Sequence, residues 1–181
     1  FSASHTELHI DAGATLLASD DLKTWPAGKH IISASGLTDL AITGTGTVDG
    51  QGLAWWKAFD KDESIFRPHM VDTGNVDRML LTDVTFINGP NHILELGSNN
   101  CEVARVTILN PPTGPAGHGV NTDAIDVHGE PFYVHDCHFD TGDDNIAAHM
   151  PVQILHGPFL FRFECGTFHS CTATLMLAYC S

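Results

Sequence analysis

The sequence predicts an all-β protein whose chain winds into a parallel β-helix, a solenoid of stacked coils. Residues 79–86, 101–108 and 132–139 each carry four apolar side chains at the same relative positions. The first two copies are offset by 22 residues and the next two by 31, and a loop rich in proline and glycine at 111–119 accounts for the longer offset. No stretch shows a helical period, and turn residues separate the short apolar runs. A strand-based repeat near this length is typical of a β-solenoid.

The elements before these copies fit the same plan. Residues 7–18 are expected to form two short strands broken by a glycine turn, and residues 40–42 are a looser, earlier copy of the repeat. An insertion that contains Trp55-Trp56 and Arg67 follows this earlier copy. We expect both tryptophans to pack over the insertion rather than to stack on a sugar ring.

A β-sandwich is the alternative fold, because it also consists of short strands at regular spacing. The fixed register of three copies favours the solenoid, and a leucine-rich repeat would need a consensus that is absent. The repeat weakens after Met150. We therefore expect a truncated β-helix domain at 1–150 and an atypical tail at 151–181 that is not native sequence of the protein's family.

Composition excludes several classes of protein. A chain of 181 residues with 43% hydrophobic and 17% charged residues has enough apolar side chains for one folded domain. The net charge of −14 argues against nucleic acid or an anionic membrane as a partner, and no apolar run approaches the roughly 18 residues of a membrane span. The 12 histidines titrate near pH 6.5, so mildly acidic medium would remove much of the repulsion toward a polyanion. We expect a monomer.

Two acidic motifs form the candidate site. Asp123 and Asp144 each lie two residues before an isoleucine that follows a turn, so the solenoid register predicts equivalent places on adjacent coils, about 4.8 Å apart. Asp143 adjoins Asp144 at the bend. Carboxylates this close cannot all ionise freely, so one should hold a proton, as glycoside hydrolysis requires. A calcium site or a set of turn aspartates would also explain the motifs. Glu95 and Asp126 are expected to be structural.

An ordered set of motifs extends beyond these aspartates: 44–52 with the Trp-Trp pair, Arg67-Pro68, 81–93, 121–126 and 142–147. Over roughly residues 7–149 this set resembles the polygalacturonase family of glycoside hydrolases, family 28. The resemblance implies a right-handed parallel β-helix of the pectin-lyase-like type. It also implies a secreted enzyme that cuts α-1,4-galacturonan in pectin, an acidic cell-wall polysaccharide, without a metal or other cofactor.

The resemblance also implies residue roles. Asp143 matches the general acid, and Asp123 and Asp144 match the carboxylates that hold and deprotonate the attacking water, so that the anomeric carbon inverts. Asn121 matches the asparagine of its motif and is expected to support the site and the substrate. His118 lies in a Gly-His-Gly tripeptide that precedes Asp123 instead of following the acidic pair, so we expect a loop residue with at most a substrate-binding role.

The chain departs from the family pattern after its acidic pair. The family's later Gly-His-Gly and Arg-x-Lys segments have no counterpart, so the activity of this chain stays open. Two other functions remain: a β-helix pectate lyase that uses calcium and a basic residue, and a solenoid without catalysis. Arg67 and Arg105 are expected to form ion pairs within the acidic chain.

Overall fold

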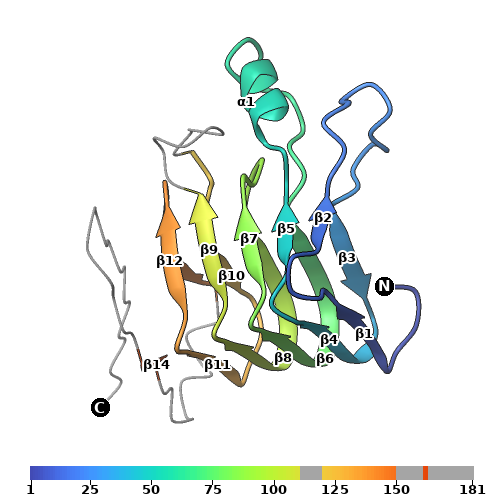
Figure 1. Ribbon diagram of the computed structural model, residues 1–181, viewed down its shortest axis with the longest axis vertical. Helices are drawn as coiled ribbons and strands as arrows, with labels where there is room; N and C mark the ends of the chain where they lie inside the picture. The colour runs from blue at the N-terminus through green and yellow to red at the C-terminus, as the bar shows by residue number, and fades with distance from the viewer. Residues whose placement is uncertain (111–119, 150–160, 163–181) are drawn as a thin grey trace.

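The computed structural model describes residues 1–110, 120–149 and the backbone of 161–162. Parallel strands stack coil upon coil, and each complete coil passes through three faces of the solenoid (Figure 1). In the described part of the chain every strand pairing is parallel, which confirms the expected β-helix and excludes the antiparallel β-sandwich.

The strands on the first face carry the candidate site. They are β3 (Ile32–Ser35), the first half of β6 (Val71–Thr82), the first half of β8 (Leu94–Ala104), β10 (Ile125–Val127) and β13 (Ile146–Ala148).

The second face continues from the first after a bend within β6 and β8. It consists of β1 (Thr6–His9), β4 (Thr38–Thr43), the second halves of β6 and β8, β11 (Phe132–His135) and β14 (Phe161–Arg162).

The third face is a separate sheet, and its strands stand side by side in Figure 1. They are β2 (Thr15–Leu17), β5 (Thr47–Asp49), β7 (Thr85–Ile87), β9 (Thr107–Asn110) and β12 (His138–Thr141).

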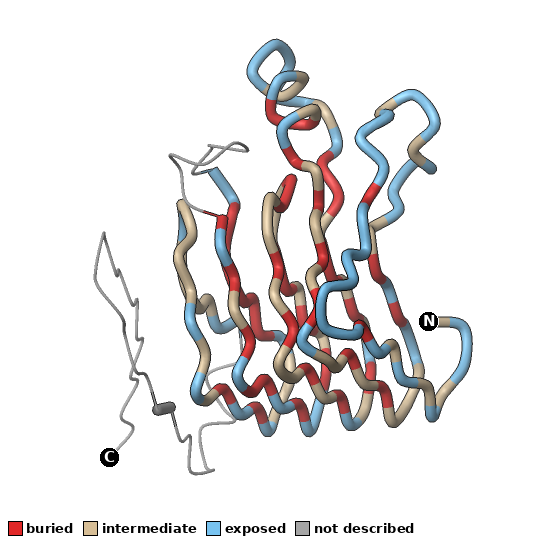
Figure 2. Tube along the Cα trace, in the orientation of Figure 1, coloured by how far each residue is buried: buried red, intermediate tan, exposed pale blue. Residues whose placement is uncertain are grey.

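The register confirms the sequence repeat. Met79 pairs with Cys101, and Cys101 pairs with Phe132, so the first apolar position of the three copies forms one continuous stack. Leu40 pairs with Met79, which confirms the earlier copy. These stacked residues are almost fully buried, whereas their neighbours along the strands are exposed or half-buried, as the alternating colours in Figure 2 show. Alternation at period two therefore builds the core that runs along the solenoid axis.

The corner between the second and third faces is made the same way in successive coils. Gly44, Asp83, Arg105 and Asp136 occupy equivalent positions, and all four have positive φ. Aspartate and glycine tolerate this left-handed conformation better than most residues. Arg105 pairs with Asp83 on the preceding coil, 2.7 Å from Nε to Oδ1, which confirms the ion pair expected for this arginine.

The insertion contains a helix that the sequence periodicity did not predict. Helix α1 (Leu53–Phe59) projects beyond the coils in Figure 1. Its seven residues are too few for a helical period to emerge, and it is stabilised by tertiary packing rather than by its own propensity. Trp55 and Trp56 are 3% and 2% exposed, so they pack as expected and are not available to stack on a ligand.

Candidate active site

Equivalent positions just before the strands of the first face form a ladder of polar side chains. Each lies two residues before the paired positions of β3, β6, β8, β10 and β13. We call this set the entry ladder, and its members in order along the solenoid are His30, His69, His92, Asp123 and Asp144.

The predicted equivalence of Asp123 and Asp144 agrees with this register. The Ala124 amide donates a hydrogen bond to the Asp144 carbonyl oxygen at 2.9 Å, as expected for neighbouring rungs. One carboxylate oxygen from each of Asp123, Asp143 and Asp144 lies within 4.8 Å of the others. Asp123 is buried, Asp144 is half-buried and Asp143 is exposed. The structure thus brings together all three aspartates that the motifs singled out.

Backbone amides hold the Asp143 carboxylate in place. The Asn121 amide donates to Oδ2 at 2.9 Å and the Asp144 amide donates to Oδ1 at 3.0 Å. The backbone of Asn121 has a φ of 56°, a conformation that asparagine tolerates well. Both oxygens of Asp143 are therefore oriented by rigid donors from two neighbouring coils.

Arg67 connects the helical insertion to this site. Its guanidinium donates to the carbonyl oxygens of Pro90 and Val120 and to the side-chain oxygen of Asn121, at 3.0 to 3.1 Å. It also lies over the rings of Trp56 and Phe59, with Cζ 4.3 and 4.2 Å from their centroids. The expectation of an ion pair was wrong for Arg67: among the described residues no carboxylate pairs with it, and carbonyls and aromatic faces satisfy it instead.

Asp123 has a strongly altered acidity. Burial raises its pKa, and the charge of Asp126 and, more weakly, that of Asp143 act in the same direction; His92 opposes them, and the pKa is raised to about 6. A carboxylate with this pKa is a stronger base than an ordinary aspartate and still ionises near neutral pH.

The sequence motifs did not predict the network of side chains that lies next to Asp123. His92 Nε2 lies 3.3 Å from Asp123 Oδ2, and His92 Nδ1 faces Glu95 at 2.8 Å and Asp126 at 3.2 Å. Glu95 and Asp126, which were expected to be structural only, thus belong to one network with Asp123. The signal was present in the repeat, because His92 occupies the same register as Asp123, one coil earlier.

Two further histidines extend this network. His128 Nε2 lies 2.6 Å from Glu95 and His149 Nε2 lies 3.1 Å from Asp126, and the two rings are stacked with their centroids 4.8 Å apart. His118 lies outside the described residues, and so does most of the tail at 151–181.

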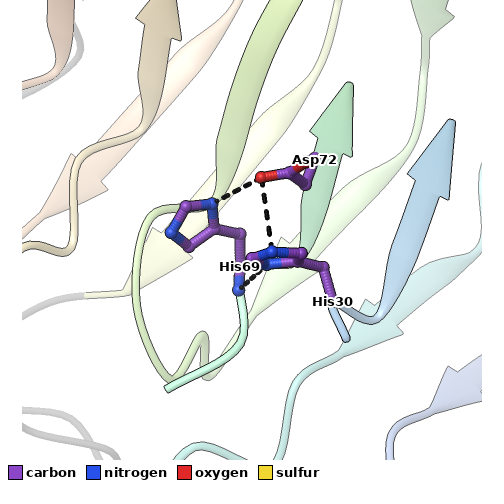
Figure 3. A group of neighbouring side chains, drawn as sticks. All are labelled: His30, His69 and Asp72. Carbon is purple, nitrogen blue, oxygen red and sulfur yellow. Dashed lines mark hydrogen bonds and ion pairs between the residues drawn. The ribbon is translucent and has the colours of Figure 1, made fainter. Parts of the chain in front are cut away.

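Several His and carboxylate groups in the described part have donor atoms close enough for a metal ion, and Figure 3 shows the group farthest from the aspartates, His30, His69 and Asp72. His30 Nδ1 accepts the His69 amide hydrogen at 3.0 Å, so in the neutral ring the proton must reside on Nε2. That Nε2–H faces Asp72 at 3.6 Å and has no lone pair for a metal. This group is a hydrogen-bonded cluster as it stands. The Asp123, Asp143 and Asp144 group retains the oxygen donors that calcium prefers.

Fold and site together define a class of protein. A solenoid of parallel coils that gathers three carboxylates on one face has the architecture and the acid–base groups that glycoside hydrolysis requires. The family model described as glycosyl hydrolases family 28 matches residues 2–160, and the chain belongs to this family.

Individual relatives agree with this assignment. The chain is 30% identical over 165 residues to a probable polygalacturonase of Vitis vinifera, an alignment that covers 80% of this chain and 33% of the relative. It is 27% identical to an endo-polygalacturonase of Pectobacterium carotovorum subsp. carotovorum, covering 86% of this chain and 46% of that protein.

Solved structures confirm the right-handed parallel β-helix. The polygalacturonase from Erwinia carotovora ssp. carotovora superposes with a TM-score of 0.70 at 25% identity, covering 82% of this chain and 46% of that one. A family 28 exopolygalacturonase of Yersinia enterocolitica shares the fold, with a TM-score of 0.68 at 20% identity over 81% of this chain and 36% of that chain. The chain thus spans about a third to a half of the length of these proteins.

Proposed function

We propose that this chain is the part of a polygalacturonase that carries the acid–base residues for hydrolysis of α-1,4-galacturonosyl linkages in pectin. One observation carries the proposal: the convergence of Asp123, Asp143 and Asp144 within 4.8 Å on adjacent coils of a family 28 fold. The polygalacturonase names of the relatives support the choice of substrate.

In this proposal Asp143 is the general acid. It is the most exposed of the three aspartates, so its carboxyl group is accessible to the glycosidic oxygen of a polymer bound along the face. As the bond breaks, Asp143 transfers its proton to the leaving oxygen. The two amide donors on Asp143 then stabilise the carboxylate that is left behind.

Asp123 and Asp144 hold the attacking water and remove its proton. Asp123 suits the role of base, because its pKa of about 6 increases its basicity while it remains ionised near neutral pH. Attack by water from the face opposite the leaving group inverts the anomeric carbon, so an α-linkage yields a β-product.

The spacing of the carboxyl groups does not by itself favour inversion. Inverting glycosidases usually separate their two carboxyl groups by roughly 6.5–9.5 Å, and retaining ones by roughly 5–5.5 Å. The oxygens here approach within 4.8 Å. We assign inversion because two carboxylates, Asp123 and Asp144, share the water, so that neither is free to attack the sugar directly.

We further propose that the protein acts outside the cell as a monomer and requires no cofactor. The acidic polysaccharide substrate lies outside the cell, and protonation of histidines in mildly acidic medium reduces the repulsion between the −14 chain and a polyanion. Within the described residues no helix is long and apolar enough to cross a membrane.

The experiment is an assay of polygalacturonate cleavage that distinguishes hydrolysis from elimination. The proposal predicts new reducing ends without ultraviolet-absorbing unsaturated products, and equal rates with and without a calcium chelator. Unsaturated products and loss of rate in chelator would instead indicate a lyase. Absence of any cleavage would favour the solenoid without catalysis.

A further inference from the structure

We propose that His92 is a positioning residue: a half-buried imidazolium that holds the Asp123 carboxylate ionised and oriented toward the water. This inference rests on the proposed function for the role of the water, whereas the ion pair itself can be tested without turnover.

The geometry of the ring carries the proposal. Nε2 of His92 faces Asp123 at 3.3 Å, and Nδ1 faces Glu95 at 2.8 Å and Asp126 at 3.2 Å. A neutral imidazole has one N–H donor and one lone pair, so one of its nitrogens would present a lone pair to a carboxylate. Only the doubly protonated ring offers a proton to both sides. A doubly protonated His92 could not be the ligand of a metal, because a ligating nitrogen must be unprotonated.

The surroundings of His92 favour this charge. Burial by itself disfavours the imidazolium, but the hydrogen bond to Glu95 and the nearby negative charges of Asp126 and Asp123 outweigh burial and raise the pKa of His92 to about 10. Asp126 is 2% exposed, so its carboxylate is stabilised by this cation and by His149 rather than by water.

The neighbouring rung keeps the charge localised on His92. The rings of His69 and His92 are stacked, with centroids 4.9 Å apart and planes within 10° of parallel. Burial and the charges of His30 and His92 lower the pKa of His69. Along the entry ladder, the pKa is thus lowered at His69 and raised at His92, which lies next to Asp123.

The charge of His92 matters to Asp123 because the other groups facing that aspartate are acidic. Asp126 on β10 and Asp143 on the next coil disfavour its ionisation, as does burial, and Asp144 lies close by. His92 is the cation that opposes them. Without His92, the pKa of Asp123 should rise, so the loss of rate on the acidic side of the pH–rate profile should begin at higher pH.

The first test reads the protonation states directly in the folded protein. Nitrogen NMR of the imidazole is expected to show His92 doubly protonated from pH 5 to about 8, while His69 is neutral at the upper end of that range. A His92 ring that is neutral at pH 7 would overturn the inference.

The second test removes the cation. In His92→Gln, carbon NMR of the Asp123 carboxyl should show a pKa about one pH unit higher than in wild type. At acidic pH, where Asp123 is then protonated, kcat/KM should fall about tenfold. His135→Gln is the matched control, because His135 also pairs with two carboxylates, Glu102 and Asp136, but lies on the second face. The double variant His92→Gln/Asp126→Asn also removes the Asp126 charge that would lack a partner, so it should fold even if the single variant does not.

The two proposals fail in different ways. The positioning role would be overturned if Asp123 titrated in His92→Gln as it does in wild type, and in the double variant as it does in Asp126→Asn alone. A shifted titration in a protein that cleaves no polygalacturonate would support the ion pair and overturn the proposed function.

Discussion

At the scale of single residues, the proposed roles of the three aspartates are argued from their surroundings. Asp123 is buried over a cation, whereas Asp143 is exposed and receives two amide hydrogen bonds. Identical side chains thus lie in different environments, and such differences allow carboxylates to take separate acid and base roles.

Removal of the proton donor should abolish most of the activity. Asp143→Asn keeps the size of the side chain but cannot release a proton to the leaving oxygen, so kcat should fall about a thousandfold with little change in stability. Reducing-end release from polygalacturonate measures this. The control is Asp140→Asn on the third face, which should leave the rate unchanged. Equal loss in both variants would contradict the assignment of Asp143.

The stability of the fold should depend on the charge of His92. The folded pKa of about 10 lies above the unfolded value near 6.5, so this stabilisation is complete below pH 6.5 and is lost as the pH rises through about 10. Wild type should exceed His92→Gln by on the order of 2 kcal/mol at pH 6, and the difference should shrink toward pH 10. Urea unfolding of both proteins over this range measures it, and a constant difference would argue against a charged His92.

The sequence could predict part of the site at this scale. The repeat register was enough to align Asp123 with Asp144, because equal offsets from paired isoleucines fix equal places on neighbouring coils. It could not predict the network around His92, because that depends on how two ring nitrogens are oriented between strands. Composition suggested only that histidines would titrate together, whereas burial lowers the pKa of His69 and neighbouring carboxylates raise that of His92.

At the scale of elements, the helical insertion braces the coils that carry the three aspartates. Trp56 and Phe59 of α1 present their ring faces to Arg67, and Arg67 holds the side chain of Asn121. The amide of Asn121 in turn donates to Asp143. A contact made by α1 is thus connected to the proposed acid through one arginine and one asparagine.

This brace predicts that Arg67→Lys is not a conservative change. A lysine ammonium cannot reach three separated oxygens and lie flat between two rings, so Asn121 loses its support. We expect kcat to fall about tenfold with a smaller change in KM, because the substitution misorients Asp143 rather than removing it. Arg105→Lys, at an exposed ion pair, is the control and should leave kcat unchanged. An unchanged kcat in Arg67→Lys would mean that the brace does not affect Asp143.

The corner between the second and third faces predicts a different kind of sensitivity. Gly44 has φ of +97°, and a Cβ there would overlap the backbone carbonyl of Ile10 on the preceding coil. Gly13 also has positive φ, +78°, but a Cβ there would meet no atom within 4 Å. Gly44→Ala should therefore lower the unfolding free energy by about 3 kcal/mol and Gly13→Ala by about 1 kcal/mol. Chemical denaturation measures both, and equal losses would contradict the close approach of the coils at Gly44.

At the scale of the whole molecule, stacking explains why the fold was easier to predict than the site. A solenoid repeats one set of backbone contacts, so apolar spacing in three copies fixed the register of Met79, Cys101 and Phe132. The helix in the insertion interrupts that repeat and left no periodic signal. The roles of His118 and of the tail fall outside the described residues and stay predictions.

The stereochemistry of the product tests the central claim most directly, because it depends on all three carboxylates together. Proton NMR during the first minutes of polygalacturonate cleavage, before mutarotation equilibrates the anomers, identifies the configuration of the new reducing end. The account predicts the β-anomer, formed by water held between Asp123 and Asp144. Initial release of the α-anomer would contradict it. Retention would mean that Asp123 or Asp144 attacks the sugar as a nucleophile, and the close spacing of these carboxylates to Asp143 would allow such an attack.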